Sequence, residues 1–149
     1  MTDTKTASGT TDSTRETATG WFAALASGDA DRAMEYLADD VEWINYTPVP
    51  GYNDRMAWIG TCHGRKEVME SFKVFLGQVD VLGEDIVELV VQDDQAMGVV
   101  RERSVVRRTG RPFEIEFVQW LTVRDGKIVR WKSFTDPSQI LRALQGGAS

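Results

Sequence analysis

The chain has 149 residues, 42% hydrophobic and 27% charged, which is the composition of one ordinary globular domain and leaves no room for a second. Its net charge of −6 and pI near 4.8 argue against a nucleic-acid partner, because phosphate backbones are bound through clustered Lys and Arg. The single cysteine, Cys62, excludes an intramolecular disulfide and a multi-cysteine metal site, and it fits a reducing, cytoplasmic location.

The two ends of the chain are expected to lie outside the folded domain. Residues 1–12 lack the apolar core of a secretion signal. No stretch approaches the ~18 apolar residues of a membrane span, so no membrane partner is expected. We predict a disordered tail over 1–12, one domain over 13–145 and a flexible C-terminus over 146–149.

Helical periodicity dominates the first part of that domain. Ser13-Thr14-Arg15-Glu16 has the S-x-x-E form of a capping box and predicts a helix over about 14–27. Gly28-Asp29 ends that helix and caps a second one, whose apolar stripe consists of Ala30, Ala33, Met34 and Leu37. A third amphipathic helix is predicted over about 65–77.

A short strand and an apolar loop are predicted between these helices. The β-branched and aromatic residues of 41–46 indicate the strand, and the prolines that follow begin an irregular loop over about 47–62. The loop is too apolar for a plain linker, because it carries Tyr52, Met56 and Trp58. We therefore expect it to fold over another part of the domain.

The second half has the period of two that is typical of strands. Four strands are predicted, at about 79–92, 96–108, 112–123 and 127–135, with turns at Asp93-Asp94, Thr109-Gly110 and Asp125-Gly126. Asp136-Pro137-Ser138 then starts a terminal helix. Helices followed by an antiparallel meander indicate an α+β fold in which one curved sheet wraps the helices.

Strand alternation directs a few polar side chains toward the core. Three arginines on the strand from Val99 belong in water, so the intervening Glu102 is directed inward. On the other strands the inward polar residues are Asn45, Gln119 and Ser133. The apolar residues expected around them are Trp21, Trp43, Ile115, Phe117 and Trp131, and a few polar groups in an apolar lining are typical of a small-molecule pocket.

The opposite face of the sheet is also apolar. Val118 and Trp120 lie there and are too hydrophobic for free solvent, whereas Glu114 and Glu116 face out beside the arginines. We expect a second copy of the chain to cover this outer face in a homodimer.

Four stretches of the sequence together resemble a known family. They are Trp21 to Leu25 with Ser27-Gly28-Asp29, Ala38 to Trp43, Gly60 to Val68, and Asp125 to Ile128 with Trp131 and Asp136. In this order they resemble the SnoaL-like, ketosteroid isomerase-like branch of the NTF2-like superfamily over about 15–142. The resemblance implies a cone-shaped fold with a curved antiparallel sheet around about three N-terminal helices, a C-terminal helix and a hydrophobic pocket. It also implies frequent dimerisation through the sheet.

Comparison with two enzymes of this superfamily shows changed catalytic positions. The catalytic tyrosine and two aspartates of ketosteroid isomerase fall at Trp21, Asn45 and Gln119, so its base would be an amide, which accepts no proton at neutral pH. The Asp-Arg-Asp triad of limonene epoxide hydrolase falls at Glu102, Val100 and Ser133, which removes the arginine and one carboxylate.

Glu102 is the best catalytic candidate. Burial in an apolar cone would raise its pKa toward neutrality, which suits a general acid or base, although it could instead pair with a neighbouring side chain as structure. His63, the only histidine, is a second proton carrier if it lies at the pocket rim and a plain surface residue if it does not. Trp58 joins the other tryptophans as a pocket-wall candidate. No cofactor or metal is expected, because ligands are too few.

These residues support three hypotheses about function. The first is a cofactor-independent isomerase, cyclase or lyase that transfers a proton on a small hydrophobic, polyketide-, terpenoid- or steroid-like substrate, with Glu102 as proton carrier and the other polar residues orienting. The second is a non-catalytic protein that binds a small ligand, and the third is an epoxide hydrolase.

Overall fold

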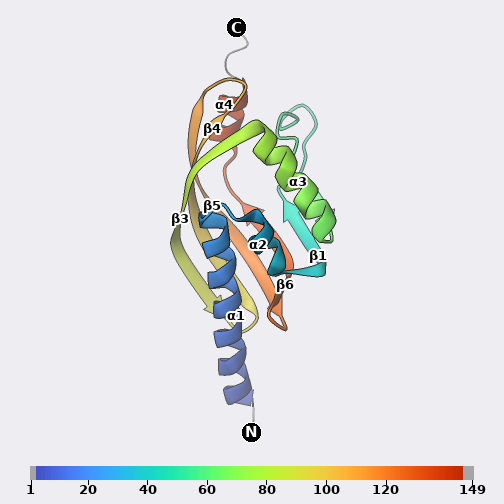
Figure 1. The fold of residues 1–149 in the computed structure, drawn as a ribbon, viewed down its shortest axis with the longest axis vertical. Coiled ribbons are helices and arrows are strands. Elements are labelled where there is room, and N and C mark those ends of the chain that lie inside the picture. The colour runs from blue at the N-terminus through green and yellow to red at the C-terminus, as the bar shows by residue number, and fades with distance from the viewer. Residues whose placement is uncertain (1–2, 146–149) are drawn as a thin grey trace.

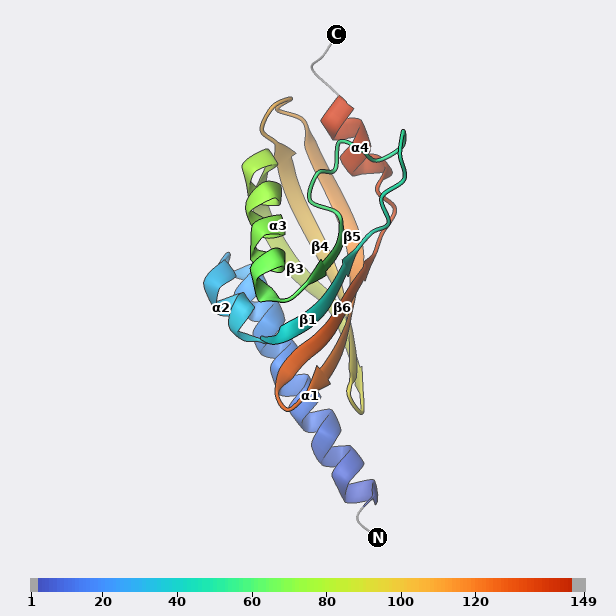
Figure 2. The same cartoon turned by 90° about the vertical axis from the view of Figure 1, so that its right-hand side faces the viewer.

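A curved, unclosed sheet of six strands forms the body of the molecule, and the helices lie on its concave side and at its ends (Figures 1 and 2). The computed structural model describes residues 3–145. The elements in chain order are α1 (Asp3–Ala26), α2 (Ala30–Glu35), β1 (Leu37–Asn45), β2 (Gly60–His63), α3 (Arg65–Gln78), β3 (Val79–Gln92), β4 (Gln95–Val106), β5 (Pro112–Arg124), β6 (Lys127–Phe134) and α4 (Ser138–Gln145). The strand order is β2-β1-β6-β5-β4-β3, and only the β1–β6 pair is parallel.

The predicted α+β fold and its meander are confirmed. Strands β3 to β6 lie within two residues of their predicted bounds, and the turn residues Asp93, Gly110, Asp125 and Gly126 have the positive φ angles that such tight turns require. The predicted loop over 47–62 is wrong at its end, because residues 60–63 form β2. This edge strand of four residues pairs only with β1, and so short a segment carries too little alternation to be recognised.

Helix α1 extends further than its capping box indicates. It begins at Asp3, so α1 includes residues 3–12 of the segment predicted as a tail; residues 1–2 and 146–149 lie outside the described residues. Two threonine hydroxyls, one in this extension and one at the start of the predicted helix, bind α1 to the β3–β4 turn. Thr14 Oγ1 donates to the Asp93 carbonyl oxygen at 2.6 Å, and Asp93 N–H donates to Thr11 Oγ1 at 2.9 Å. These tertiary bonds are invisible in local sequence.

Alternation along β4 and β5 is as predicted. The even residues of β4 from Ala96 to Val106 are buried, and Arg101 and Arg103 are exposed between them. Arg101 forms ion pairs at 3.8 Å with both Glu114 and Glu116 on the outer face. Because the arginines stay outside, the side chain of Glu102 faces the interior.

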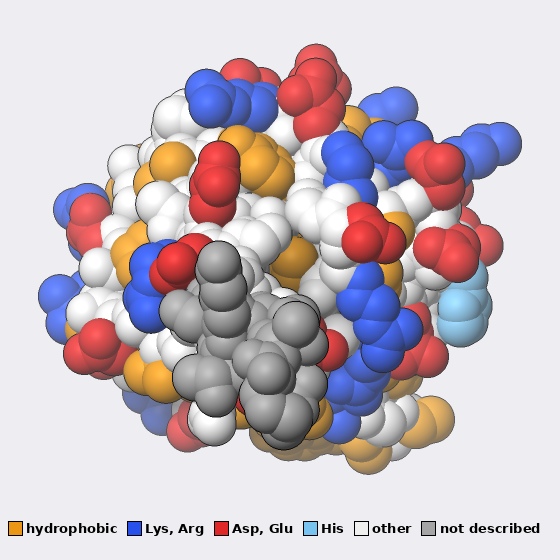
Figure 3. Space-filling model, turned by 90° about the horizontal axis from the view of Figure 1, so that it is seen from below, with side chains coloured by type: hydrophobic (Ala, Val, Ile, Leu, Met, Phe, Trp, Pro, Cys, Tyr) orange, Lys and Arg blue, Asp and Glu red, His pale blue; other side chains and the backbone are white. Residues whose placement is uncertain are grey.

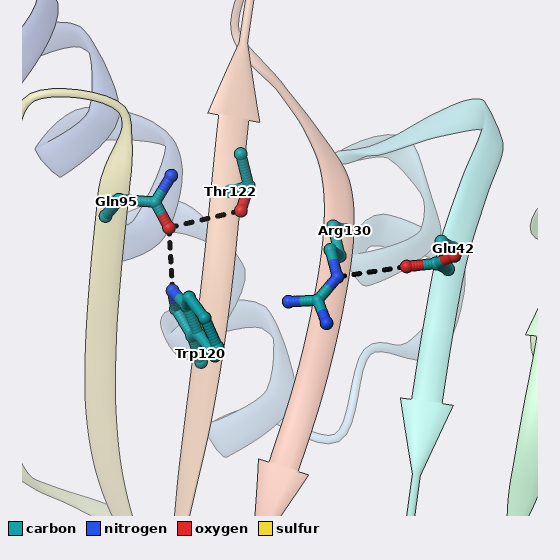
Figure 4. A network of polar contacts seen from close by, with 5 residues as sticks. All are labelled: Glu42, Gln95, Trp120, Thr122 and Arg130. Atoms are coloured by element: carbon teal, nitrogen blue, oxygen red, sulfur yellow. Dashed lines mark hydrogen bonds and ion pairs between the residues drawn. The ribbon is translucent and has the colours of Figure 1, made fainter.

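The outer face of the sheet holds a polar network around Trp120 (Figure 4). Trp120 Nε1 donates to Gln95 Oε1 at 2.7 Å, and Thr122 Oγ1 donates to the same oxygen at 3.2 Å. The Arg130 guanidinium lies 5.0 Å from the Trp120 ring centroid and pairs through Nε with Glu42 at 2.9 Å. Trp120 is therefore held on the outer face by a hydrogen bond and a cation–π contact.

Charges of both signs are interspersed over the end of the molecule where α1 begins, rather than gathered by sign (Figure 3). None of the described helices is long and apolar enough to cross a membrane.

The core consists of two hydrophobic clusters, and Phe117 of β5 packs against both. One cluster surrounds Trp21, Trp43 and Trp131, between α1, β1 and β6. The other surrounds Trp58 and Ile115, beneath α4 and the loop after β1. The space between the clusters is where a cavity lies.

Gly98 allows Phe22 of α1 to pack closely against the sheet, and substitution of Gly98 tests this packing. A Cβ atom at Gly98 would lie 2.2 Å from the Phe22 ring, so Gly98→Ala must displace α1 or the ring and is expected to lower the free energy of unfolding by roughly 1–3 kcal/mol. Gly77→Ala is the control, because a Cβ there meets nothing within 4 Å and alanine favours helix. Thermal unfolding of both variants measures the difference. Equal stability would contradict the assigned packing.

Candidate functional site

A cavity of about 400 Å³ lies between the two core clusters. Its opening is formed by exposed residues of the α1–α2 joint, including Asp29, together with Leu76 and Leu82. Its inner wall consists of buried residues from the loop after β1 and from β1, β4, β5, β6 and α4, which are Trp43, Trp58, Glu102, Ile115, Gln119, Trp131 and Ile140. This volume lies within the range of small-molecule sites.

Glu102 is the only charged side chain among the buried residues that the structure describes. It is 5% exposed, and its Oε2 accepts a hydrogen bond from Ser104 Oγ at 2.8 Å. Burial raises the pKa of Glu102 to about 6, and the bond from Ser104 opposes that rise. The carboxyl group is therefore poised to gain or lose a proton near neutral pH.

Glu84 of β3 lies beside Glu102 on the same wall of the cavity. The two residues are directly opposed in the β3–β4 register and both line the cavity, and opposed Cβ atoms in such pairs lie roughly 4.5–5.5 Å apart. Burial first, and then the charge of Glu102, raise the pKa of the half-buried Glu84 to about 8. We refer to Glu84 and Glu102 as the acid pair. Two carboxyl groups this close favour holding one proton between them.

Tyr46 adds a third titratable group on the same side of the cavity. It follows β1 with φ of 56°, a left-handed conformation that turns the chain sharply into the loop. Burial, and the negative charge of Glu102, raise the pKa of the Tyr46 hydroxyl above its ordinary value. Tyr46 thus remains a neutral hydroxyl that can donate a hydrogen bond.

Gln119 of β5 presents hydrogen-bond donors to the cavity. Its Oε1 accepts from Trp21 Nε1 at 2.8 Å and from Trp131 Nε1 at 2.7 Å. Indole N–H groups only donate, so these two bonds fix which end of the amide is the oxygen. Nε2 has no acceptor among the described residues, although Gln119 is 2% exposed and lines the cavity. The amide N–H groups are left for a ligand.

Gln119 belongs to a row of polar residues that crosses three strands. It is opposed to Ser133 on β6, and Ser133 is opposed to Asn45 on β1. Ser133 Oγ donates to Asn45 Oδ1 at 2.9 Å, and Asn45 itself lines the cavity. We refer to these three residues as the amide row. Gln119 in this row is four residues along β5 from Ile115, the residue opposed to Glu102. At 3.3 Å per residue the row is therefore roughly 13 Å along the strand from Glu102.

Aromatic side chains form much of the cavity wall. Along the β5 register, Phe117 lies between the level of Glu102 and the amide row, and Trp131, which is opposed to Leu121, lies on the far side of that row. The rings of Trp43 and Trp131 stack with centroids 3.6 Å apart and planes 3° apart, and Trp58 meets Phe75 edge to face at 5.0 Å. Phe72 and Phe117 complete this wall. Trp43 Nε1 is buried without an acceptor among the described residues. Such a lining favours a flat apolar ligand.

The structure brings together most of the residues expected at the site. Glu102, Asn45 and Gln119 line the cavity, as do the wall residues Trp43, Trp58, Ile115, Phe117 and Trp131. Trp21 and Ser133 lie outside the lining and act through bonds to Gln119 and Asn45. His63 is exposed on β2, outside the lining. The histidine therefore has no contact with the cavity in this structure.

Sequence reasoning missed Glu84 and Tyr46. The reason for Glu84 is a β-bulge between Val81 and Gly83, which shifts the β3 register by one residue and turns Glu84 and Ile86 inward, until a second shift between Ile86 and Glu88 restores the earlier alternation. The signal was present, because the apolar residues Val79 and Val81 alternate with polar ones before Gly83, a residue that often marks a bulge in a strand. The side chain of Tyr46 depends on a positive φ angle, which alternation cannot reveal.

The described residues of the lining include acidic side chains but no basic ones. Asp29, Glu84 and Glu102 supply three carboxyl groups, whereas no Lys, Arg or His lines the cavity in the described part of the chain. The described residues also contain no group of three or more His, Cys, Asp or Glu side chains suited to a metal ion. The chemistry available from these residues is proton transfer by carboxyl groups, with amide and hydroxyl donors to bind an oxygen atom of a ligand.

Comparison with known proteins supports the fold. The chain is similar to an NTF2-like protein from Burkholderia thailandensis, with 26% identity over 89% of this chain and 97% of that chain and a TM-score of 0.78. It is also similar to an NTF2-like protein from Burkholderia xenovorans, with 24% identity over 91% and 98% and a TM-score of 0.71. A protein of ketosteroid isomerase-like fold from Catenulispora acidiphila, in complex with trimethylamine, matches with 16% identity over 89% and 95% and a TM-score of 0.71.

The sequence itself gives the family. Comparison with curated protein sequences gives no match. A family model described as a SnoaL-like domain matches residues 18–131, which is most of the chain. The protein therefore belongs to the SnoaL-like family, with the NTF2-like fold that the sequence motifs predicted.

Proposed function

We propose that this protein is a cofactor-independent enzyme of the isomerase, cyclase or lyase type that transfers a proton within a small hydrophobic substrate. One observation carries the proposal, namely that the buried carboxyl group of Glu102 shares an apolar cavity with the unpartnered amide donors of Gln119. A base near neutral pH and a donor for developing negative charge are the two groups that proton abstraction next to a carbonyl requires.

The proposed step begins with the Glu102 carboxylate, which removes a proton from a carbon atom adjacent to a carbonyl group or conjugated with it. The electron pair of the broken C–H bond moves onto the carbonyl oxygen, where Nε2 of Gln119 and the amide of Asn45 donate hydrogen bonds to the resulting enolate. Protonated Glu102 then returns the proton to another atom of the substrate. The charge on the carboxylate moves to the enolate and back, so the step needs no oxidant or reductant.

Glu84 supports this role of Glu102 by sharing its proton. With a pKa of about 8, Glu84 holds a proton at pH 7, whereas Glu102, with a pKa of about 6, is mostly ionised. A protonated carboxyl opposite an ionised one stabilises the base without neutralising it. The acid pair therefore suits base catalysis near neutral pH.

We also propose that two copies associate through the outer sheet face. Valine, methionine and aromatic side chains form a continuous patch there across β3 to β6, consisting of Val90, Met97, Val99, Val118, Trp120 and Phe134. Among them, Val90 is 60% exposed and Met97 and Phe134 are each 46% exposed. An exposed apolar face on a sheet is typical of a self-complementary interface.

The proton-transfer proposal is tested by deuterium exchange. The wild-type protein in D2O is expected to accelerate incorporation of deuterium at the acidic carbon of hydrophobic ketones, beginning with 2-tetralone and measured by NMR. Glu102→Gln should reduce this acceleration by about 10²-fold or more, because an amide cannot accept the proton. Glu116→Gln is the matched control, since that carboxylate lies on the outer face.

Equal exchange by the wild type and Glu102→Gln, for every ketone shown by calorimetry to bind, would refute Glu102 as the base. Binding without any exchange would instead favour the alternative of a non-catalytic binding protein.

The raised pKa values of the acid pair predict a dependence of stability on pH. Both pKa values lie above the ordinary 4.5, so the unfolded chain releases these protons at lower pH than the folded chain does. The free energy of unfolding should therefore fall as pH rises from 4.5 to 6 through both groups, and from 6 to 8 mainly through Glu84. Differential scanning calorimetry should show that Glu84→Gln flattens the decline between pH 6 and 8. Asp85→Asn, an exposed neighbour, should leave it unchanged.

Association through the outer face is tested by light scattering coupled to size-exclusion chromatography. Met97→Lys is expected to convert a dimer into a monomer, because it places a charge in the patch. Val74→Lys, at an exposed apolar position on α3, should leave the dimer intact. A monomeric wild type at micromolar concentration would contradict the interface.

A further inference from the structure

The charge balance of the cavity points to the kind of substrate it accepts. Glu84 and Glu102 are neighbours on adjacent strands, and Asp29 lies at the opening. Among the described residues, no ion pair joins any of these three to a basic side chain. A carboxylate that is buried without a counter-charge is unfavourable, and it favours a ligand that brings a positive charge.

The basic residues near the acid pair are held on the other face of the sheet. Arg101 pairs with Glu114 and Glu116 on that face. Arg103 is exposed, and its guanidinium lies against Gly83, the residue before Glu84. The β3 bulge therefore separates Glu84 from the neighbouring arginine and leaves its carboxyl group on the cavity side.

Aromatic rings surround the same end of the cavity. Ile115, which is opposed to Glu102 on β5, belongs to the cluster that contains Trp58, and Tyr46, Phe75 and Phe117 pack against that cluster. The faces of such rings attract cations, so aromatic side chains beside carboxylates are typical of sites that bind alkylated ammonium groups.

The amide row supplies an independent sign that a ligand spans the cavity. Gln119 is 2% exposed, yet its Nε2 has no acceptor in the described part of the chain, and its orientation is fixed by Trp21 and Trp131. Nε2 faces the cavity, where an oxygen atom of a ligand can accept its hydrogen bonds. The cavity thus offers donors at one end and negative charge at the other.

We infer that the substrate is a hydrophobic amine, whose protonated nitrogen binds Glu84 against Tyr46, Trp58 and Phe75 while its acceptor oxygen binds the amide row. This inference rests on the proposed function, because it names the substrate class of the same cavity. In this arrangement Glu84 holds the ammonium group, and the deeper Glu102, beside Ser104, moves the proton.

The inference is tested with three ligands that share the tetralin scaffold. These are 2-(dimethylamino)tetralin, which is protonated at pH 7, its neutral isostere 2-isopropyltetralin, and the anion tetralin-2-carboxylate. By calorimetry the amine should bind the wild type about tenfold or more tightly than the neutral compound, with the anion weakest, because a hydrogen-bonded charge adds to the apolar contact. Equal binding of the amine and the neutral compound, or no binding of the amine, would overturn the inference.

Variants locate the positive charge within the cavity. Glu84→Gln should reduce the preference for the amine to within about twofold, because an amide offers no negative charge. Asp85→Asn, whose side chain is exposed, should keep the full preference. A preference that survives in folded Glu84→Gln would overturn the assignment to Glu84.

Proton release gives a measurement that needs no variant. Glu84, with a pKa of about 8, is protonated at pH 7 and must ionise to pair with the ammonium group, so amine binding should release nearly one proton to the buffer. Affinity should rise between pH 6 and 8. Among the titratable groups that line the cavity, Glu102 of β4 is opposed to Glu84 in the register, and Tyr46 after β1 and Asp29 of the α1–α2 joint also belong to the lining, with Arg103 on the outer side of β3. Absence of proton release in buffers of different ionisation enthalpy would overturn the pairing.

The two proposals fail separately. Amine preference without Glu102-dependent deuterium exchange would keep the amine inference and remove the proton-transfer function. Exchange of 2-tetralone with no preference for the amine would keep the function and overturn the substrate class.

Discussion

The proposed proton transfer depends on keeping the carboxyl group of Glu102 out of contact with water. Glu102 is buried at the boundary between two hydrophobic clusters, with only Ser104 as a hydrogen-bond partner, and this desolvation brings its pKa close to neutrality. The rest of the sheet maintains that environment, because alternation along β4 keeps Arg101 and Arg103 on the outer face, where Arg101 pairs with acidic residues of β5. An arginine on the inner face would pair with Glu102 and hold its pKa low.

The second constraint is the fixed orientation of Gln119. Two indole N–H groups bind one amide oxygen, so the side chain cannot rotate to satisfy its own Nε2 within the core. Trp131, one of these donors, also stacks on Trp43, which couples the amide to the wall of the cavity. The tryptophans therefore have two roles, packing the core and holding the Gln119 amide so that its N–H groups face the cavity.

Most of the fold, and part of the site, could be predicted from the sequence. Regular alternation on β4 and β5 placed Glu102 and Gln119 inside, and glycine and aspartate marked the turns. The features that could not be predicted depend on register or tertiary contacts. A bulge turns Glu84 inward, a positive φ angle places Tyr46 on the cavity wall, and hydrogen bonds of Thr11 and Thr14 with Asp93 join α1 to the β3–β4 turn. Single-residue shifts of this kind reverse a side chain's face without changing the overall pattern.

The bulge at Val81–Gly83 gives Glu84 an environment that a strand with regular alternation would not provide. A regular β3 would place Glu84 in solvent, where its ordinary pKa would make it a plain surface anion; the extra residue instead sets it opposite Glu102. Two carboxyl groups at such a distance destabilise the folded protein when both are ionised, so the arrangement lowers stability unless a proton or a cation lies between them. At pH 7 a proton on Glu84 meets this requirement, and a ligand that carries a positive charge can take the place of that proton.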